Sequence, residues 1–146
     1  MGCRQRHFDC EVSTLLEFDP QEDGEQAGLT VFMNALGHYD IGMIRKEGRT
    51  YIIFSRRVGS IKVIERQDAI TVNEVILSVR ANANEYSFAY TAAEGIEIEI
   101  GRGECRYIAT EVAGGFTGVY FGMYATGQGK ASKSPACFDF FAYKRL

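Results

Sequence analysis

Alternation of apolar and polar side chains with a period of two runs through most of this 146-residue chain. Near the N-terminus one apolar face carries a residue at every second position: Phe8, Cys10, Val12, Thr14, Leu16 and Phe18. Side chains two residues apart point to the same side of an extended strand, so this spacing predicts a half-buried β-strand. No segment of the sequence has a convincing helical period. The pattern therefore constrains the chain to an all-β fold.

The same pattern, punctuated by Gly, Asn or Asp, predicts further strands along the whole chain. We expect them near residues 28–34, 38–45, 49–57, 60–66, 74–81, 85–91, 95–100, 104–109, 117–125 and 137–143. Many short strands with tight turns and only two prolines are typical of an antiparallel β-sandwich or jelly roll. The polar stretch 127–134 is expected to be a loop between the last two strands. Residues 1–146 form a single predicted domain.

Composition and charge exclude several classes of function. The net charge of −3 and the scattered Lys and Arg give no basic field for nucleic acid. No stretch has the apolar length of a membrane helix and no signal-peptide pattern opens the chain, so we expect a cytoplasmic protein without membrane contact. The cysteines have neither metal-ligand nor redox spacing, and reduced thiols are expected at all four positions: Cys3, Cys10, Cys105 and Cys137.

Few residues suggest catalysis. Glu97 and Glu99 lie at strand spacing on one face, as two catalytic carboxylates can, but this pattern is more typical of the solvated face of a strand. His7 and His38 are the only histidines, and neither has a partner at the spacing of a catalytic triad or a metal site. The sequence therefore assigns no catalytic residue.

Aromatic residues are frequent, with 8 Tyr and 10 Phe, and most of them are expected in the core. A sugar-binding face needs exposed rings that stack on the C–H surface of a pyranose. The sequence lacks tryptophan, the ring best suited to this role, and three tyrosines are the possible carbohydrate contacts: Tyr39, Tyr120 and Tyr124. A free-standing carbohydrate-binding module thus stays open as one interpretation.

Several unusual motifs follow one another along nearly the whole chain. They are Arg4-Gln5 with Phe8, EQAGLTVFMN at 25–34, HYDI at 38–41, RRVG at 56–59, TEVAGGFTG at 110–118, GMYATG at 122–127 and Phe138-Asp139. In content and order they resemble the C-terminal sandwich domain of glycoside hydrolase family 43 β-xylosidases and α-L-arabinofuranosidases. Gly37 stands where that family often has a second histidine, so the sugar is left undetermined.

The resemblance implies a concanavalin A-like jelly roll, lacking the family's first strands, that packs against a five-bladed catalytic β-propeller. That propeller, which supplies the catalytic carboxylates, is expected to be absent from this chain. The chain is then a non-catalytic accessory domain of an enzyme acting on xylo-oligosaccharides or arabinosides, and inactive by itself. Phe116 matches a phenylalanine that lids the catalytic pocket, and Gly114 and Gly115 give its loop backbone freedom. Without the resemblance, Phe116 is better interpreted as a core residue that begins a strand.

Three further expectations concern partners. No cofactor is implied, although concanavalin-type sandwiches sometimes bind calcium, for which Asp139 and nearby backbone carbonyls would be the ligands. Asp139 is otherwise the outward residue of an alternating strand. The missing first strands would leave a sheet edge uncovered, which predicts a homodimer or larger oligomer. A structural remnant that self-associates is the remaining alternative.

Overall fold

The alternating segments form strands in the computed structural model, which describes residues 2–7, 9–34, 37–92, 95–104, 119–127 and 135–146. Every regular element in these residues is a β-strand. The strands are β1 (Gly2–Arg4), β2 (Cys10–Phe18), β3 (Gln26–Asn34), β4 (Gly37–Lys46), β5 (Arg49–Val58), β6 (Ile61–Ile70), β7 (Glu74–Ala81), β8 (Glu85–Thr91), β9 (Glu97–Glu104), β10 (Tyr120–Thr126) and β11 (Ala136–Arg145). The described part of the chain has no helix long and apolar enough to cross a membrane.

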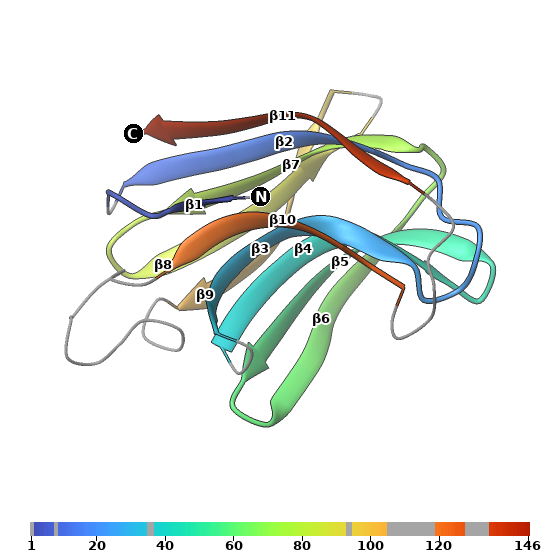
Figure 1. Ribbon diagram of the computed structural model, residues 1–146, viewed down its shortest axis with the longest axis horizontal. Coiled ribbons are helices and arrows are strands. Elements are labelled where there is room, and N and C mark those ends of the chain that lie inside the picture. The colour runs from blue at the N-terminus through green and yellow to red at the C-terminus, as the bar shows by residue number, and fades with distance from the viewer. Residues whose placement is uncertain (1, 8, 35–36, 93–94, 105–118, 128–134) are drawn as a thin grey trace.

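Two antiparallel sheets pack face to face, which confirms the predicted sandwich (Figure 1). Sheet A has six strands in the order β1-β10-β3-β4-β5-β6. Sheet B has five strands in the order β11-β2-β7-β8-β9. The chain changes sheets between β10 and β11, as expected if the 127–134 stretch connects the two, although residues 128–134 lie outside the described part.

The observed strands differ from the predicted ones in two places. The short strand β1, which pairs with β10 at one edge of sheet A, was not expected from the sequence. Residues 105–109 of the predicted strand 104–109 lie outside the described residues. The predicted strand 95–100 ends too early, because β9 runs without a break from Glu97 to Glu104. The reason is that a bulge opposite Phe88 and Ala89 shifts the alternation inside one continuous strand.

The core lies between the sheets and is rich in aromatic rings. Phe54 of sheet A packs on Phe88 of sheet B with ring centroids 4.7 Å apart, and Tyr39 lies within 6.3 Å of Phe54, Phe88 and Tyr86. Gly101 of β9 leaves room for this cluster, because a Cβ atom there would lie 2.2 Å from a ring carbon of Phe54. Ring packing between the sheets therefore depends on small residues in β9.

Candidate functional site

A polar groove of about 300 Å³ lies on the outer face of sheet A. Its lining comes from β3, β4, β6 and β10. The register of β3 and β4 places Thr30 opposite Asp40 and Phe32 opposite His38, so four outward side chains meet in one place. The groove is a product of strand pairing, because these residues share no contiguous motif.

Tyr124 of β10 lines the groove. Sheet register places Tyr124 beside Gly28, and Gly28 beside Gly42 on the next strand. A Cβ atom on Gly42 would lie 2.5 Å from the Tyr124 hydroxyl oxygen, so the two glycines let the phenol reach across β3. Gln26 donates a hydrogen bond from Nε2 to this hydroxyl. Burial and the nearby Asp40 carboxylate hold the pKa of Tyr124 well above its ordinary value, with the Gln26 hydrogen bond acting in the opposite direction.

Asp40 brings a carboxylate into this groove although it is only 8% exposed. Its Oδ2 atom lies 2.8 Å from Nδ1 of His38. The His38 ring stacks in turn on Phe32, with centroids 5.7 Å apart and an interplanar angle of 30°. Lys62 of β6 and Thr126 of β10 also line the groove. The arrangement combines a negative acceptor, amide and ammonium donors and two aromatic rings, which suits a small polyhydroxylated ligand better than bond cleavage.

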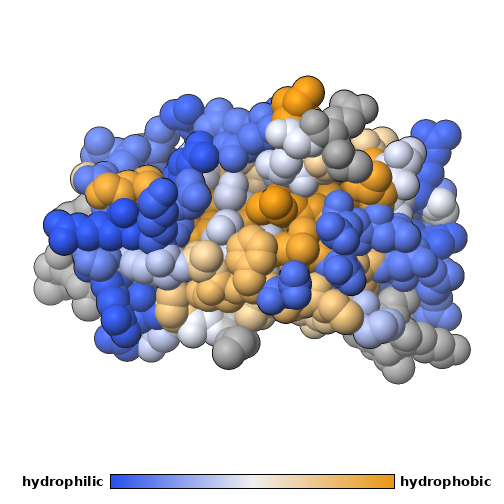
Figure 2. All heavy atoms as spheres, turned by 90° about the horizontal axis from the view of Figure 1, so that it is seen from above, coloured by the Kyte–Doolittle hydropathy of each residue, from blue (hydrophilic) through white to orange (hydrophobic). Residues whose placement is uncertain are grey.

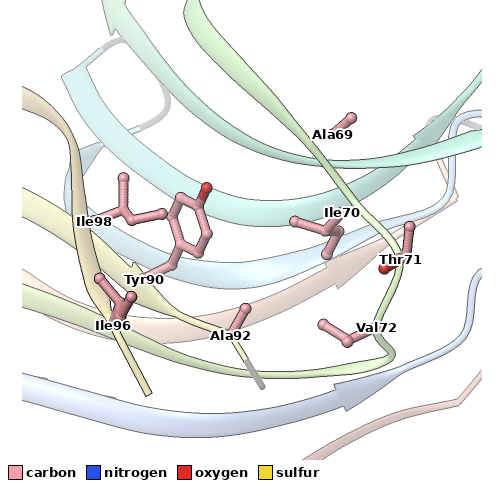
Figure 3. A pocket seen from close by; sticks show the side chains of 8 residues that line it. All are labelled: Ala69, Ile70, Thr71, Val72, Tyr90, Ala92, Ile96 and Ile98. Atoms are coloured by element: carbon pink, nitrogen blue, oxygen red, sulfur yellow. The ribbon is translucent and has the colours of Figure 1, made fainter. Parts of the chain in front are cut away.

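A second pocket, of about 320 Å³, opens between the end of β6 and the start of β9 (Figure 3). Ile70 and Val72 face Ile96, Ile98 and Tyr90 across it. The lining is mostly apolar, and the Tyr90 hydroxyl donates a hydrogen bond of 2.8 Å to Oδ2 of Asp68. This pocket can take up an apolar group, but the described part of its lining provides no carboxylate pair for hydrolysis.

The three tyrosines proposed as sugar contacts lie in different surroundings. Tyr39 is fully buried, and its hydroxyl donates a hydrogen bond of 2.7 Å to the carbonyl of Glu104. Its ring consequently offers no face to a ligand in this structure. Tyr120 is 42% exposed, and Arg4 donates a hydrogen bond of 2.7 Å to its hydroxyl. Tyr124 alone of the three lines the groove.

The proposed lid residues Phe116, Gly114 and Gly115 lie outside the described residues, so their role stays a prediction. Asp139 is an exposed residue of β11, at the bulge between Phe138 and Phe141. No three His, Cys, Asp or Glu side chains are grouped as a metal site within the described residues. The structure therefore gives the calcium prediction no cluster of acidic ligands.

Glu97 and Glu99 lie on the outer side of sheet B and do not face each other across a pocket. Glu97 forms an ion pair of 2.9 Å with Arg80, and Glu99 forms one of 2.9 Å with Arg102. Each carboxylate thus belongs to a surface ion pair, as expected for the solvated face of a strand.

Sequence reasoning did not find the groove residues Gln26, His38 and Asp40. His38, Asp40 and Gly42 share one face of β4 by their alternate positions, and this was the available signal. That signal does not name the neighbouring strands. Only the register of β4 with β3, and of β3 with β10, brings Gln26 and Tyr124 near the β4 residues.

Comparison with known proteins covers the whole sandwich. The family model described as the β-xylosidase C-terminal concanavalin A-like domain of glycoside hydrolase family 43 matches residues 1–144. The chain belongs to this family. The predicted family and the concanavalin A-like fold are thereby confirmed.

Individual relatives agree with this assignment. The chain is 35% identical over 148 residues to the non-reducing end α-L-arabinofuranosidase BoGH43B of Bacteroides ovatus, and 25% identical over 149 residues to a xylosidase/arabinosidase of Butyrivibrio fibrisolvens. In both cases 100% of this chain matches only 28% of the relative. The solved structure described as Bacteroides ovatus Xyloglucan PUL GH43B superposes with a TM-score of 0.91 at 34% identity, covering 99% of this chain and 29% of that one. The family 43 domain therefore spans less than a third of the relatives that it matches.

Proposed function

We propose that this domain is a non-catalytic accessory domain that works with a family 43 catalytic domain on xylosides or arabinosides. The observation that carries the proposal is that the whole chain matches only 28% of an α-L-arabinofuranosidase and of a xylosidase/arabinosidase. Glycoside hydrolysis usually needs two carboxyl groups placed on either side of the scissile bond. Among the residues that the structure describes, neither of the two pockets above brings such a pair together, which supports a role outside the chemical step.

In this proposal the catalytic partner is a β-propeller, and Phe116 closes its pocket. The support is the match of the Ala-Gly-Gly-Phe-Thr-Gly run to the family's lid segment. An apolar ring at the mouth of a pocket excludes water and narrows access to small substrates. Apolar residues gather at the centre of the face shown in Figure 2, and such a patch suits a domain that packs against another.

A chimera tests the accessory role. The C-terminal region of the Bacteroides ovatus arabinofuranosidase is replaced by this chain, and hydrolysis of nitrophenyl arabinofuranoside and xyloside is measured. We expect turnover from the chimera and none from the isolated chain. Phe116→Ala in the chimera should lower kcat/KM, by up to about 10²-fold if loss of the ring lets the substrate shift by about 1 Å. Phe140→Ala, at a ring that is 42% exposed on β11, is the matched control and should change little.

Two outcomes would contradict this proposal. Turnover by the isolated chain above the blank would show that it holds its own catalytic groups. A correctly folded but inactive chimera would show that the domain does not support a family 43 catalytic domain. An active chimera indifferent to Phe116→Ala would leave the accessory role standing and remove the lid.

We also propose self-association through β6. This ten-residue strand forms one edge of sheet A and exposes Ile61 at 64%, Val63 at 42% and Ile64 at 41%. A long edge strand with apolar side chains favours pairing with a second copy. Light scattering should report a dimer at micromolar concentration and a monomer for Val63→Lys, with Ile96→Lys as the control. A monomeric unaltered chain would refute the proposal.

A further inference from the structure

We propose that the polar groove on sheet A is a sugar-binding site of this domain, with Tyr124 as the stacking ring and Asp40 as the principal hydrogen-bond acceptor. The ligand class is a neutral pentose unit of a plant-type oligosaccharide. The choice of pentose depends on the proposed function, because the relatives are named for arabinoside and xyloside chemistry. The groove itself follows from the contacts of the described residues.

The burial of Asp40 is the first observation that supports a binding site. An aspartate on the outer face of a sheet is ordinarily solvated, yet this one is only 8% exposed and lies beside the imidazole of His38. Removing a carboxylate from water costs free energy unless hydrogen bonds replace the lost hydration. Nδ1 of His38 lies 2.8 Å from Oδ2 of Asp40 without forming a hydrogen bond to it, so the carboxylate, which has roughly four lone-pair directions, keeps acceptor capacity for ligand hydroxyls.

The close approach of Tyr124 to Gly28 and Gly42 is the second observation. Gly28 and Gly42 lie opposite each other on β3 and β4, and the Tyr124 phenol crosses this strip. The ring is half-buried, and its hydroxyl is held by the hydrogen bond from Gln26. A ring fixed in this way is a preorganised platform, which loses little entropy when a sugar stacks on it.

The other lining residues and the volume of the groove are the third observation. The Phe32–His38 stack stands at one side, and Phe32 is 37% exposed. Lys62 brings a cationic donor from β6. A volume of about 300 Å³ is at the small end of the range for ligand pockets, which suits one or two sugar units. A donor, an acceptor and two ring faces around this volume match the alternating hydroxyl and C–H surfaces of a sugar.

Titration calorimetry of the intact chain with xylobiose, xylotriose and L-arabinose tests the site. We expect saturable binding of at least one probe in the millimolar range. Asp40→Asn keeps the shape of the side chain and should weaken binding by about tenfold, the loss of a charge-assisted hydrogen bond. Tyr124→Leu removes the stacking ring and should weaken it by a similar factor. Glu99→Gln changes a surface carboxylate of sheet B and is the matched control.

Each outcome decides the proposal. No saturable binding of any probe, or binding that survives both Asp40→Asn and Tyr124→Leu, overturns it. Circular dichroism checks that the variants fold. If Tyr124→Leu does not fold, the titration of Asp40→Asn alone decides the proposal. If the chimera is active but the titration shows no sugar binding, only the groove proposal is contradicted. If the chimera is inactive but the titration shows saturable binding, only the accessory role is contradicted, and a free-standing binding module is favoured.

Discussion

Gly101→Ala should destabilise the domain by overfilling the aromatic core. A Cβ atom at Gly101 would lie 2.2 Å from Cδ2 of Phe54, well inside van der Waals contact. Phe54 is 1% exposed and packed against Phe88, so the ring has little room to withdraw. Overpacking a core typically costs about 1–3 kcal/mol. The lower entropy of alanine in the unfolded chain offsets roughly 0.4–1 kcal/mol, which leaves a net loss of about 1–2 kcal/mol.

Chemical denaturation with urea measures this loss, and thermal melting should fall by roughly 2–4 °C for each kcal/mol in a domain of this size. The mechanism predicts a specific coupling. Phe54→Leu destabilises by itself, but in its presence Gly101→Ala should cost much less, because the clashing ring has gone. A coupling free energy of about 1 kcal/mol is expected. Phe140→Leu is the control, since Phe140 is 42% exposed on β11 and should show no coupling. A neutral Gly101→Ala, or strict additivity with Phe54→Leu, would refute the packing argument.

Three further predictions follow from buried polar groups. Tyr39→Phe should cost about 1–2 kcal/mol, because it removes the hydrogen bond of 2.7 Å to the Glu104 carbonyl, and it should leave sugar titrations unchanged; a variant as stable as the parent would contradict this. Burial, and then the hydrogen bond to Asp68, raise the pKa of Tyr90 from 10 to about 12, so the folded state binds this proton more tightly than the unfolded state does. The stability that this difference contributes is complete below pH 10 and is lost as the pH rises through about 12. Denaturation of Tyr90→Phe should lose less stability over that interval, and an identical pH dependence would count against it. Cys10 is 0% exposed, and burial raises the pKa of its thiol. Alkylation with iodoacetamide, mapped by mass spectrometry, should therefore modify the exposed Cys137 first and reach Cys10 only under denaturing conditions. Equal alkylation rates at Cys10 and Cys137 would show that the core opens.

The alternating pattern alone was enough to predict an all-β sandwich. In β2, Val12, Thr14 and Leu16 are buried as the spacing required, because a strand can place a period-two apolar set only on one side. The motifs between residues 4 and 139 also carried the family, which the match over residues 1–144 confirmed. These features are local, since each depends on neighbouring positions in one chain segment.

Strand pairing decided the rest. The sequence could not show that Tyr39 faces the core while Tyr124 faces a groove, because both lie in alternating aromatic strands, and only the stacking of two sheets gives each face its environment. Gln26, Asp40 and Tyr124 belong to three strands, β3, β4 and β10, and β10 lies far along the chain from the other two. Their meeting depends on the register between paired strands, which is non-local for β3 and β10, and a slip of one residue would turn each side chain of a strand to the opposite face. The local alternation of apolar and polar residues therefore predicts the fold class, whereas the groove forms only when the strands pair in the sheet.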